Sequence, residues 1–180
     1  MTTIRVMAGG LASDAVESRV AEASPGWRVE TECEIYYPYH WVLLRYVAST
    51  LFGRSASPVW CVVDARTGLA ATTDPFELAF MERNDLGAAK IADPRVDAAD
   101  AIAIARRYAA YVMRQRRKAL VVPRVDVVER AVVYKPMSTV RLSRAGEPSF
   151  RVLVDRMSGG FHVLSSSAGE RGAPRAQWLI

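Results

Sequence analysis

The sequence predicts an α+β protein in which a helix packs on a curved antiparallel sheet, with this unit present twice. A helical pattern precedes each of two similar sets of strands. An apolar run ending in Asp and followed by a turn glycine occurs at residues 62–68 and returns at 153–159. Upstream of these runs, residues 35–38 resemble residues 133–136, each ending in proline. We interpret the pattern as duplication of one helix-plus-meander unit.

The two turns carry acidic residues, Asp64 and Asp155, in the same place before a glycine. An Asp side chain at such a position can bond to the turn's own backbone, and Gly68 or Gly159 can adopt positive φ without strain. A pair of carboxylates for acid and base catalysis is the alternative. Their matched positions favour the structural role.

Composition indicates a folded protein. The chain has 180 residues, 51% of them hydrophobic and 9% aromatic, enough for one large core or two small ones. No apolar run approaches the roughly 18 residues of a membrane span, and residues 1–5 do not begin an export signal. We therefore expect a cytoplasmic protein with no membrane span. Its two cysteines, Cys33 and Cys61, are expected to be reduced, buried thiols.

In the first half, apolar residues at helical spacing predict a helix over residues 13–23, stopped by a Pro-Gly pair. Residues 27–47 are predicted to form a long strand, because apolar side chains alternate and later occupy both parities. Residues 1–10 are expected to be a loose arm and residues 51–58 a loop. A returning strand over 59–63 then leads into the Asp64 turn.

Further along, Asp74, Pro75 and Glu77 form a capping pattern that predicts a short helix. The strongest helical pattern begins at Asp97 and continues to about Lys118. One further strand is expected directly after the Asp64 turn, over 69–72. After the Asp97 helix, strands are expected over 125–134, 137–143, 150–155 and 161–164. The predicted organisation is a first unit over 1–90, a second unit over 91–165 and a flexible tail over 166–180.

The second unit resembles the PepSY domain family. The resemblance is carried by the helix motif of residues 97–105, with its Ala-Ile-x-Ile-Ala core, and by the turn motif Val-Asp-x-x-Thr-Gly at 63–68. It covers residues 95–165 and, more weakly, 12–73. The resemblance implies a cystatin-like fold, and members of the family are commonly non-catalytic, some of them restraining or presenting peptidases and envelope proteins.

The sequence offers little for catalysis or metal binding. His40 and His162 are the only histidines, and neither lies in a motif of a metal site or a catalytic triad. Glycine pairs at 9–10 and 159–160 lack the lysine of a phosphate-binding loop. We therefore expect no cofactor and no metal, and a protein that is not an enzyme is favoured over an enzyme.

An aromatic cluster is the most distinctive candidate site. Tyr and Trp are enriched at binding hot spots because they combine large area with a polar group. The candidate binding residues are Tyr36, Tyr37, Tyr39, His40, Trp41 and Tyr46. We predict a non-enzymatic binding or accessory module that engages a protein or peptide through this aromatic-rich sheet surface, although core packing of the same residues stays open. The alternative is a small-molecule enzyme or carrier that uses the concave face of the sheet.

A basic cluster at the end of the strongest helix provides the third hypothesis, nucleic-acid binding. Residues 91–180 carry 16 Lys and Arg against 8 Asp and Glu, whereas residues 1–90 carry 8 against 11. The candidate basic patch is Arg106, Arg107, Arg114, Arg117 and Lys118. A solvated helix face explains the same residues and is favoured, so we expect a protein or peptide partner, with a homodimer as a further possibility.

Overall fold

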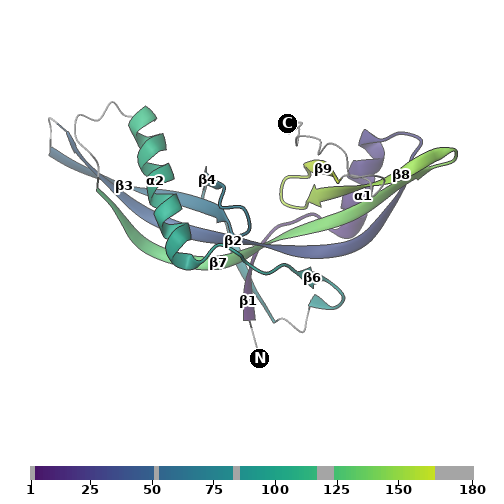
Figure 1. Ribbon diagram of the computed structural model, residues 1–180, viewed down its shortest axis with the longest axis horizontal. Coiled ribbons are helices and arrows are strands. Elements are labelled where there is room, and N and C mark those ends of the chain that lie inside the picture. Colours follow the sequence, from purple (N-terminus) through teal and green to yellow (C-terminus); the bar gives the residue numbers. More distant parts are fainter. Residues whose placement is uncertain (1–2, 51–52, 83–85, 117–123, 165–180) are drawn as a thin grey trace. The chain divides into compact units, whose positions relative to one another are not determined.

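The computed structural model describes residues 3–50, 53–82, 86–116 and 124–164. Within these ranges it contains two helices and nine strands (Figure 1). In chain order they are β1 (Thr3–Met7), α1 (Ser13–Ala23), β2 (Arg28–Thr50), β3 (Gly53–Asp64), β4 (Ala70–Thr73), β5 (Leu78–Glu82), β6 (Lys90–Ile91), α2 (Ala98–Arg116), β7 (Arg124–Arg144), β8 (Glu147–Asp155) and β9 (Phe161–Leu164). No helix in the described ranges is both long enough and apolar enough to cross a membrane.

All nine strands belong to one mixed sheet. Its main path runs β4-β3-β2-β7-β1-β5, while β6 pairs with β2, β8 pairs with β7, and β9 pairs with β8. Two of the pairings are parallel, β1 with β7 at Val6 and Tyr134, and β2 with β6 at Ile35 and Tyr36. The hairpins β2–β3 and β7–β8 are antiparallel.

The predicted fold class is therefore wrong. A duplicated cystatin-like unit would place a helix on its own antiparallel meander twice in succession, whereas this chain forms a large mixed sheet of nine strands. The separate strands predicted over 125–134 and 137–143 are one strand, β7, which runs through Pro136. Pro38 and Pro136 each lie inside a continuous strand where that strand changes neighbours. Strand β2 leaves β6 after Tyr36 and joins β3 from Tyr39, and β7 joins β8 from Met137.

The chain gathers into two compact units. Unit 1 comprises Met1–Tyr37, Glu77–Ala92 and Tyr134–Ile180, and unit 2 comprises Pro38–Phe76 and Asp93–Val133. Strands β2 and β7 each contribute residues to both units. The sequence-based boundary at residue 90 falls in β6, inside unit 1.

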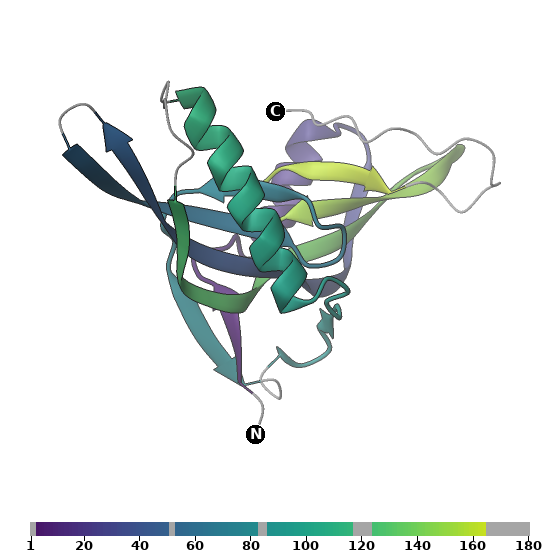
Figure 2. The same cartoon turned by 60° about the vertical axis from the view of Figure 1, so that its left-hand side comes forward.

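Unit 2 is built around α2, which lies across the face of its strands (Figures 1 and 2). Small helix residues at three- and four-residue spacing, Ala101, Ala105 and Ala109, are fully buried against the sheet. Their strand partners in the core are Val42, Leu44, Tyr46, Val59, Cys61 and Val63. Because alanine has a short side chain, the helix can approach the strands closely.

Unit 1 has two hydrophobic clusters. In the first, Val16 and Val20 of α1 pack with Val140 and Leu142 of β7 and with β8 residues, beside an edge-to-face contact between Trp27 and Phe150. The second is formed by four buried residues, Ile4, Val6, Tyr36 and Leu86. Burial, and then the charge of Glu34, raises the pKa of Tyr36 above its usual value, opposed by Arg156.

Several local predictions are confirmed. Helix α1 spans the predicted residues, and α2 begins where the Asp97 cap indicated, with the Asp100 N–H donating to Asp97 Oδ1 at 2.8 Å. Both cysteines are free, but only Cys61 is buried as predicted, and Cys33 is half-buried. Burial raises the pKa of Cys61 to about 11. This thiol therefore stays protonated at neutral pH.

The two aspartate turns also form as predicted. Asp64 Oδ1 accepts the Arg66 N–H at 2.8 Å, and Asp155 Oδ1 accepts the Met157 N–H at 2.9 Å. The glycines four residues further on have φ of 76° and 72°. These hydrogen bonds give both carboxylates the structural role favoured by the sequence.

Three segments differ from the sequence prediction. The expected loose arm contains β1, the expected short helix after Asp74 is instead the strand β5, and β1 pairs with β5 from Thr3–Glu82 to Met7–Leu78. The expected loop over 51–58 contains the start of β3, which pairs with β2 from Gly53 onwards. For β1 and β5, pairing with a distant strand outweighs the local pattern, whereas residues 53–58 extend the adjacent β2–β3 hairpin. The predicted flexible tail over 166–180 lies outside the described residues.

Candidate functional site

The first half of β7 forms an open edge of the unit 2 sheet. Residues 124–133 follow β2 in the strand order, whereas the only β1 pairing is at Tyr134 and the β8 pairing begins at Met137. Within the described ranges, no strand pairs with residues 124–133 on the side away from β2. Val128 and Val132 on this segment are 58% and 36% exposed. An edge of this kind can accept a further strand.

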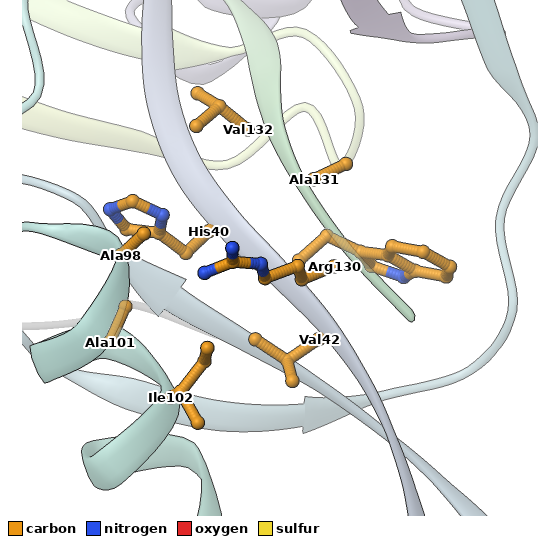
Figure 3. Close-up of a pocket in the computed structure, with 9 residues that line it drawn as sticks. His40, Val42, Ala98, Ala101, Ile102, Arg130, Ala131 and Val132 are labelled. Atoms are coloured by element: carbon orange, nitrogen blue, oxygen red, sulfur yellow. The ribbon is translucent and has the colours of Figure 1, made fainter. Parts of the chain in front are cut away.

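A pocket lies beside this edge, between α2 and β7 (Figure 3). Its volume is about 150 Å³. The lining residues come from three elements, His40, Trp41 and Val42 of β2, Ala98, Ala101 and Ile102 of α2, and Arg130, Ala131 and Val132 of β7. The short side chains of Ala98 and Ala101 leave space on the α2 side.

The α2 side of the pocket is fixed by a network around the Asp64 turn. The Ala65 carbonyl accepts the N–H groups of Arg95 and Val96 at 2.7 and 2.8 Å, and the Ala65 N–H donates to the Pro38 carbonyl at 3.1 Å. These bonds tie the segment before α2 to both β2 and the turn. The helix then starts at a defined place, directed by its Asp97 cap.

His40 forms part of the pocket wall in a fixed orientation. Its side chain is buried, 6% exposed, and Nε2 lies 2.8 Å from the Val96 carbonyl oxygen. A carbonyl oxygen only accepts, so Nε2 carries a proton and donates it in this bond. In the neutral imidazole, Nδ1 is then the acceptor. His40 thus positions the pocket wall through a satisfied hydrogen bond.

The lining of the pocket is mostly apolar. Besides His40 and Arg130, its side chains are apolar or aromatic, and it includes no carboxylate, hydroxyl or thiol. No nucleophile therefore accompanies the imidazole in the lining. The volume also limits the ligand. Sites for drug-sized molecules occupy roughly 300–1,000 Å³, whereas a cavity of about 150 Å³ holds a group as large as benzene. A single side chain fits this space.

Charge at the pocket is carried by Arg130. In Figure 3 its side chain extends from β7 toward the centre of the pocket. Two other charges of this part of the strand are paired, since Asp126 binds Arg124 at 2.8 Å and also Arg45 of β2 at 3.3 Å. The hydrogen bond from Arg124 lowers the pKa of Asp126 below its usual value, with a smaller effect of Arg45. In the part of the chain that the structure describes, Arg130 forms no ion pair.

The six predicted aromatic-cluster residues are divided between the two units. Tyr36 is buried in unit 1 and Tyr46 in the unit 2 core. Tyr37 and Tyr39 are half-buried and make interactions of their own. Only His40 and Trp41 line the pocket. The sequence located part of the pocket correctly, but it could not show which members of the strand face the core.

The predicted basic patch is partly described. Arg106, Arg107 and Arg114 are exposed on α2, whereas Arg117 and Lys118 lie outside the described residues. The residues that sequence reasoning missed are those of β7 and the start of α2, above all Arg130 and Ala98. Their only sequence signal was a valine-rich strand with a cap-initiated helix upstream, which does not reveal an open edge.

The described residues contain no group of three His, Cys, Asp or Glu side chains that could hold a metal ion. No family model, curated protein or solved structure matches this chain. The PepSY resemblance therefore stays a prediction, and function is inferred from the pocket and the adjacent strand edge.

Proposed function

We propose that this protein is a non-enzymatic binding module that takes an extended protein or peptide segment as an added strand on β7. The observation that carries the proposal is the open edge over residues 124–133 next to a pocket of about 150 Å³. Strand addition obtains affinity from main-chain hydrogen bonds and specificity from pockets for alternate side chains. Both requirements are available here within unit 2.

The geometry supports one side chain in the pocket. Successive side chains of a strand point to opposite faces of its sheet, so every second residue of an added strand lies on the α2 side. Ala98 and Ala101 of α2 leave room on that side. The sequence predicted binding through a wider aromatic sheet surface. Here the binding groove is the pocket together with the β7 edge, residues 124–133, and of the aromatic cluster only His40 and Trp41 line it. The small volume makes a small-molecule carrier the weaker candidate.

The proposal is tested by selecting binders from a phage-displayed library of random linear peptides and measuring their affinity by fluorescence polarisation. Replacing Ala98 with Phe places a ring in the pocket from an exposed helix position, so we expect affinity to fall about tenfold or more, about 1.4 kcal/mol. Ala99→Phe is the matched control, because Ala99 is exposed on the same helix turn and does not line the pocket. It should bind as the parent does.

Strand addition predicts two further results. A peptide N-methylated at alternate amides should lose binding, because its main chain can no longer pair with β7. Bound peptide should also slow amide hydrogen exchange within residues 124–133. Failure to select any peptide, or peptides that bind Ala98→Phe as well as the parent, would overturn the proposal. Self-association of the chain that is blocked by Ala98→Phe would show that a second copy occupies the edge instead.

A further inference from the structure

We infer that the segment bound along β7 is acidic, with a carboxylate placed against Arg130. The inference rests on the proposed function and concerns the chemistry of its ligand. Arg130 lines the pocket, is exposed, and forms no ion pair within the described residues. A guanidinium that faces a binding groove without a protein partner is suited to a carboxylate, which it can bind through two parallel hydrogen bonds.

Helix α2 extends the positive charge along the groove. Ala98 and Ile102 line the pocket, and Arg106 follows at the same four-residue spacing, so it lies on the same flank one turn further on. Arg106 is exposed and, within the described ranges, also forms no ion pair. An added strand would therefore pass between two uncompensated guanidinium groups, one on each wall.

The acidic residues of α2 belong to its other flank. A Cβ added to Gly68 would lie 3.5 Å from Ile104 Cδ1, so Ile104 faces the Asp64 turn. Asp97 and Asp100 share that flank by their spacing from Ile104, and Asp97 is already used as the helix cap. On β7, Asp126 is bound by two arginines. Glu129 is the remaining exposed carboxylate of the segment, and it does not line the pocket.

A nucleic acid could also use these cations, because phosphate neutralisation needs clustered basic side chains. The pocket favours the peptide. A volume of about 150 Å³ lined by alanine, isoleucine and valine suits an aliphatic or small aromatic side chain. An unpaired strand edge likewise complements a peptide main chain, which provides both donors and acceptors. A backbone of phosphates and sugars would leave the edge N–H and C=O groups unmatched.

The test uses the tightest peptide from the random library and its variants in which Glu and Asp become Gln and Asn. We expect the acidic peptide to bind the parent protein about tenfold more tightly than its amide variant. Arg130→Gln should weaken the acidic peptide by about tenfold and leave the amide variant unchanged. Arg106→Gln should weaken the acidic peptide by about threefold. Arg107→Gln is the matched control, since Arg107 is exposed but lies on the solvent side, and it should bind normally.

Each outcome separates the inference from the proposed function. Equal affinity for acidic and amide peptides, with Ala98→Phe still impaired, overturns the acidic ligand and leaves strand addition intact. Absence of any peptide binding overturns both. A single-stranded oligonucleotide that binds more tightly than the acidic peptide, weakens steeply with salt and tolerates Ala98→Phe would show a nucleic-acid surface instead. A charge-swapped pair, Arg130→Glu with Lys in the peptide, should recover the affinity lost by Arg130→Glu alone.

Discussion

The two halves of β7 differ although they belong to one strand. Residues 137–144 pair with β8 in unit 1, and the side chains of Val140 and Leu142 are almost fully buried under α1. Residues 124–133 have β2 on one side and, within the described ranges, no strand on the other. One continuous strand therefore has a buried half, paired with β8, and a half with an open edge.

The difference indicates which half is used for packing and which is available for binding. An open edge exposes main-chain donors and acceptors, and proteins usually protect such edges with short strands, prolines or charges. The open half of β7 is ten residues long and contains no proline, since Pro136 comes after it. Its charges include the compensated Asp126 and the uncompensated Arg130. The edge is thus protected only in part, which is consistent with a strand-accepting site.

The largest expected effect separates the two halves by stability. Val140→Ala removes a fully buried side chain and should lower the free energy of unfolding by about 2.5 kcal/mol. Val128→Ala removes a side chain that is 58% exposed and should change it by less than about 0.5 kcal/mol. Urea denaturation measures both. Equal losses would mean that residues 124–133 are covered, and would remove the basis for an open edge.

A second prediction concerns Lys135, which lies between the two halves. Lys135 Nζ and Ser158 Oγ donate to Asp155 Oδ2. Burial acts to raise the pKa of Asp155, but these hydrogen bonds and the Lys135 charge outweigh burial and hold that pKa below its usual value. Replacing Lys135 with Met should lower the free energy of unfolding by about 2 kcal/mol at neutral pH.

The effect of Lys135→Met on the free energy of unfolding should depend on pH. Because the folded pKa of Asp155 is depressed, its stabilising contribution is full above the unfolded value of about 3.9 and is lost as the pH falls through the folded pKa. The difference between parent and Lys135→Met should therefore shrink at about pH 3. Lys90→Met, at an exposed lysine of β6, should match the parent at both pH values. A difference that persists unchanged in acid would contradict a role for the Asp155 charge.

Sequence patterns predicted those elements whose determinants are local. The cap at Asp97, the helical spacing of Val16 and Val20, and the Asp-to-Gly turns each place donors and acceptors within a few residues of one another. Such contacts form whatever the rest of the chain does. The structure contains all of them at the predicted positions.

Elements decided by distant contacts were not predictable in this way. The capping pattern at Asp74 favours a helix, yet residues 78–82 form β5 because β1, more than 70 positions earlier, provides a complementary strand. Pro136 separates two predicted strands, 125–134 and 137–143, yet β7 continues through it and pairs with β8 from Met137. The groove has the same origin. The sequence identified His40 and Trp41 as candidates. Arg130 and Ala98 could not be identified in this way, because they line a pocket only once α2 and β7 are brought together in the fold.

The smallest expected effect compares the two aspartate turns. Asp64 Oδ1 accepts N–H groups from Arg66 and Thr67 at 2.8 and 3.0 Å, so Asp64→Ala should lower the free energy of unfolding by about 1 kcal/mol. Asp155→Ala should cost more, because the Lys135 and Ser158 bonds are lost as well. Asp64→Asn keeps the accepting oxygen and should restore most of the stability. If Asp64→Asn proves as unstable as Asp64→Ala in urea denaturation, the negative charge matters at this turn rather than the two hydrogen bonds, and the carboxylate has a role beyond holding it.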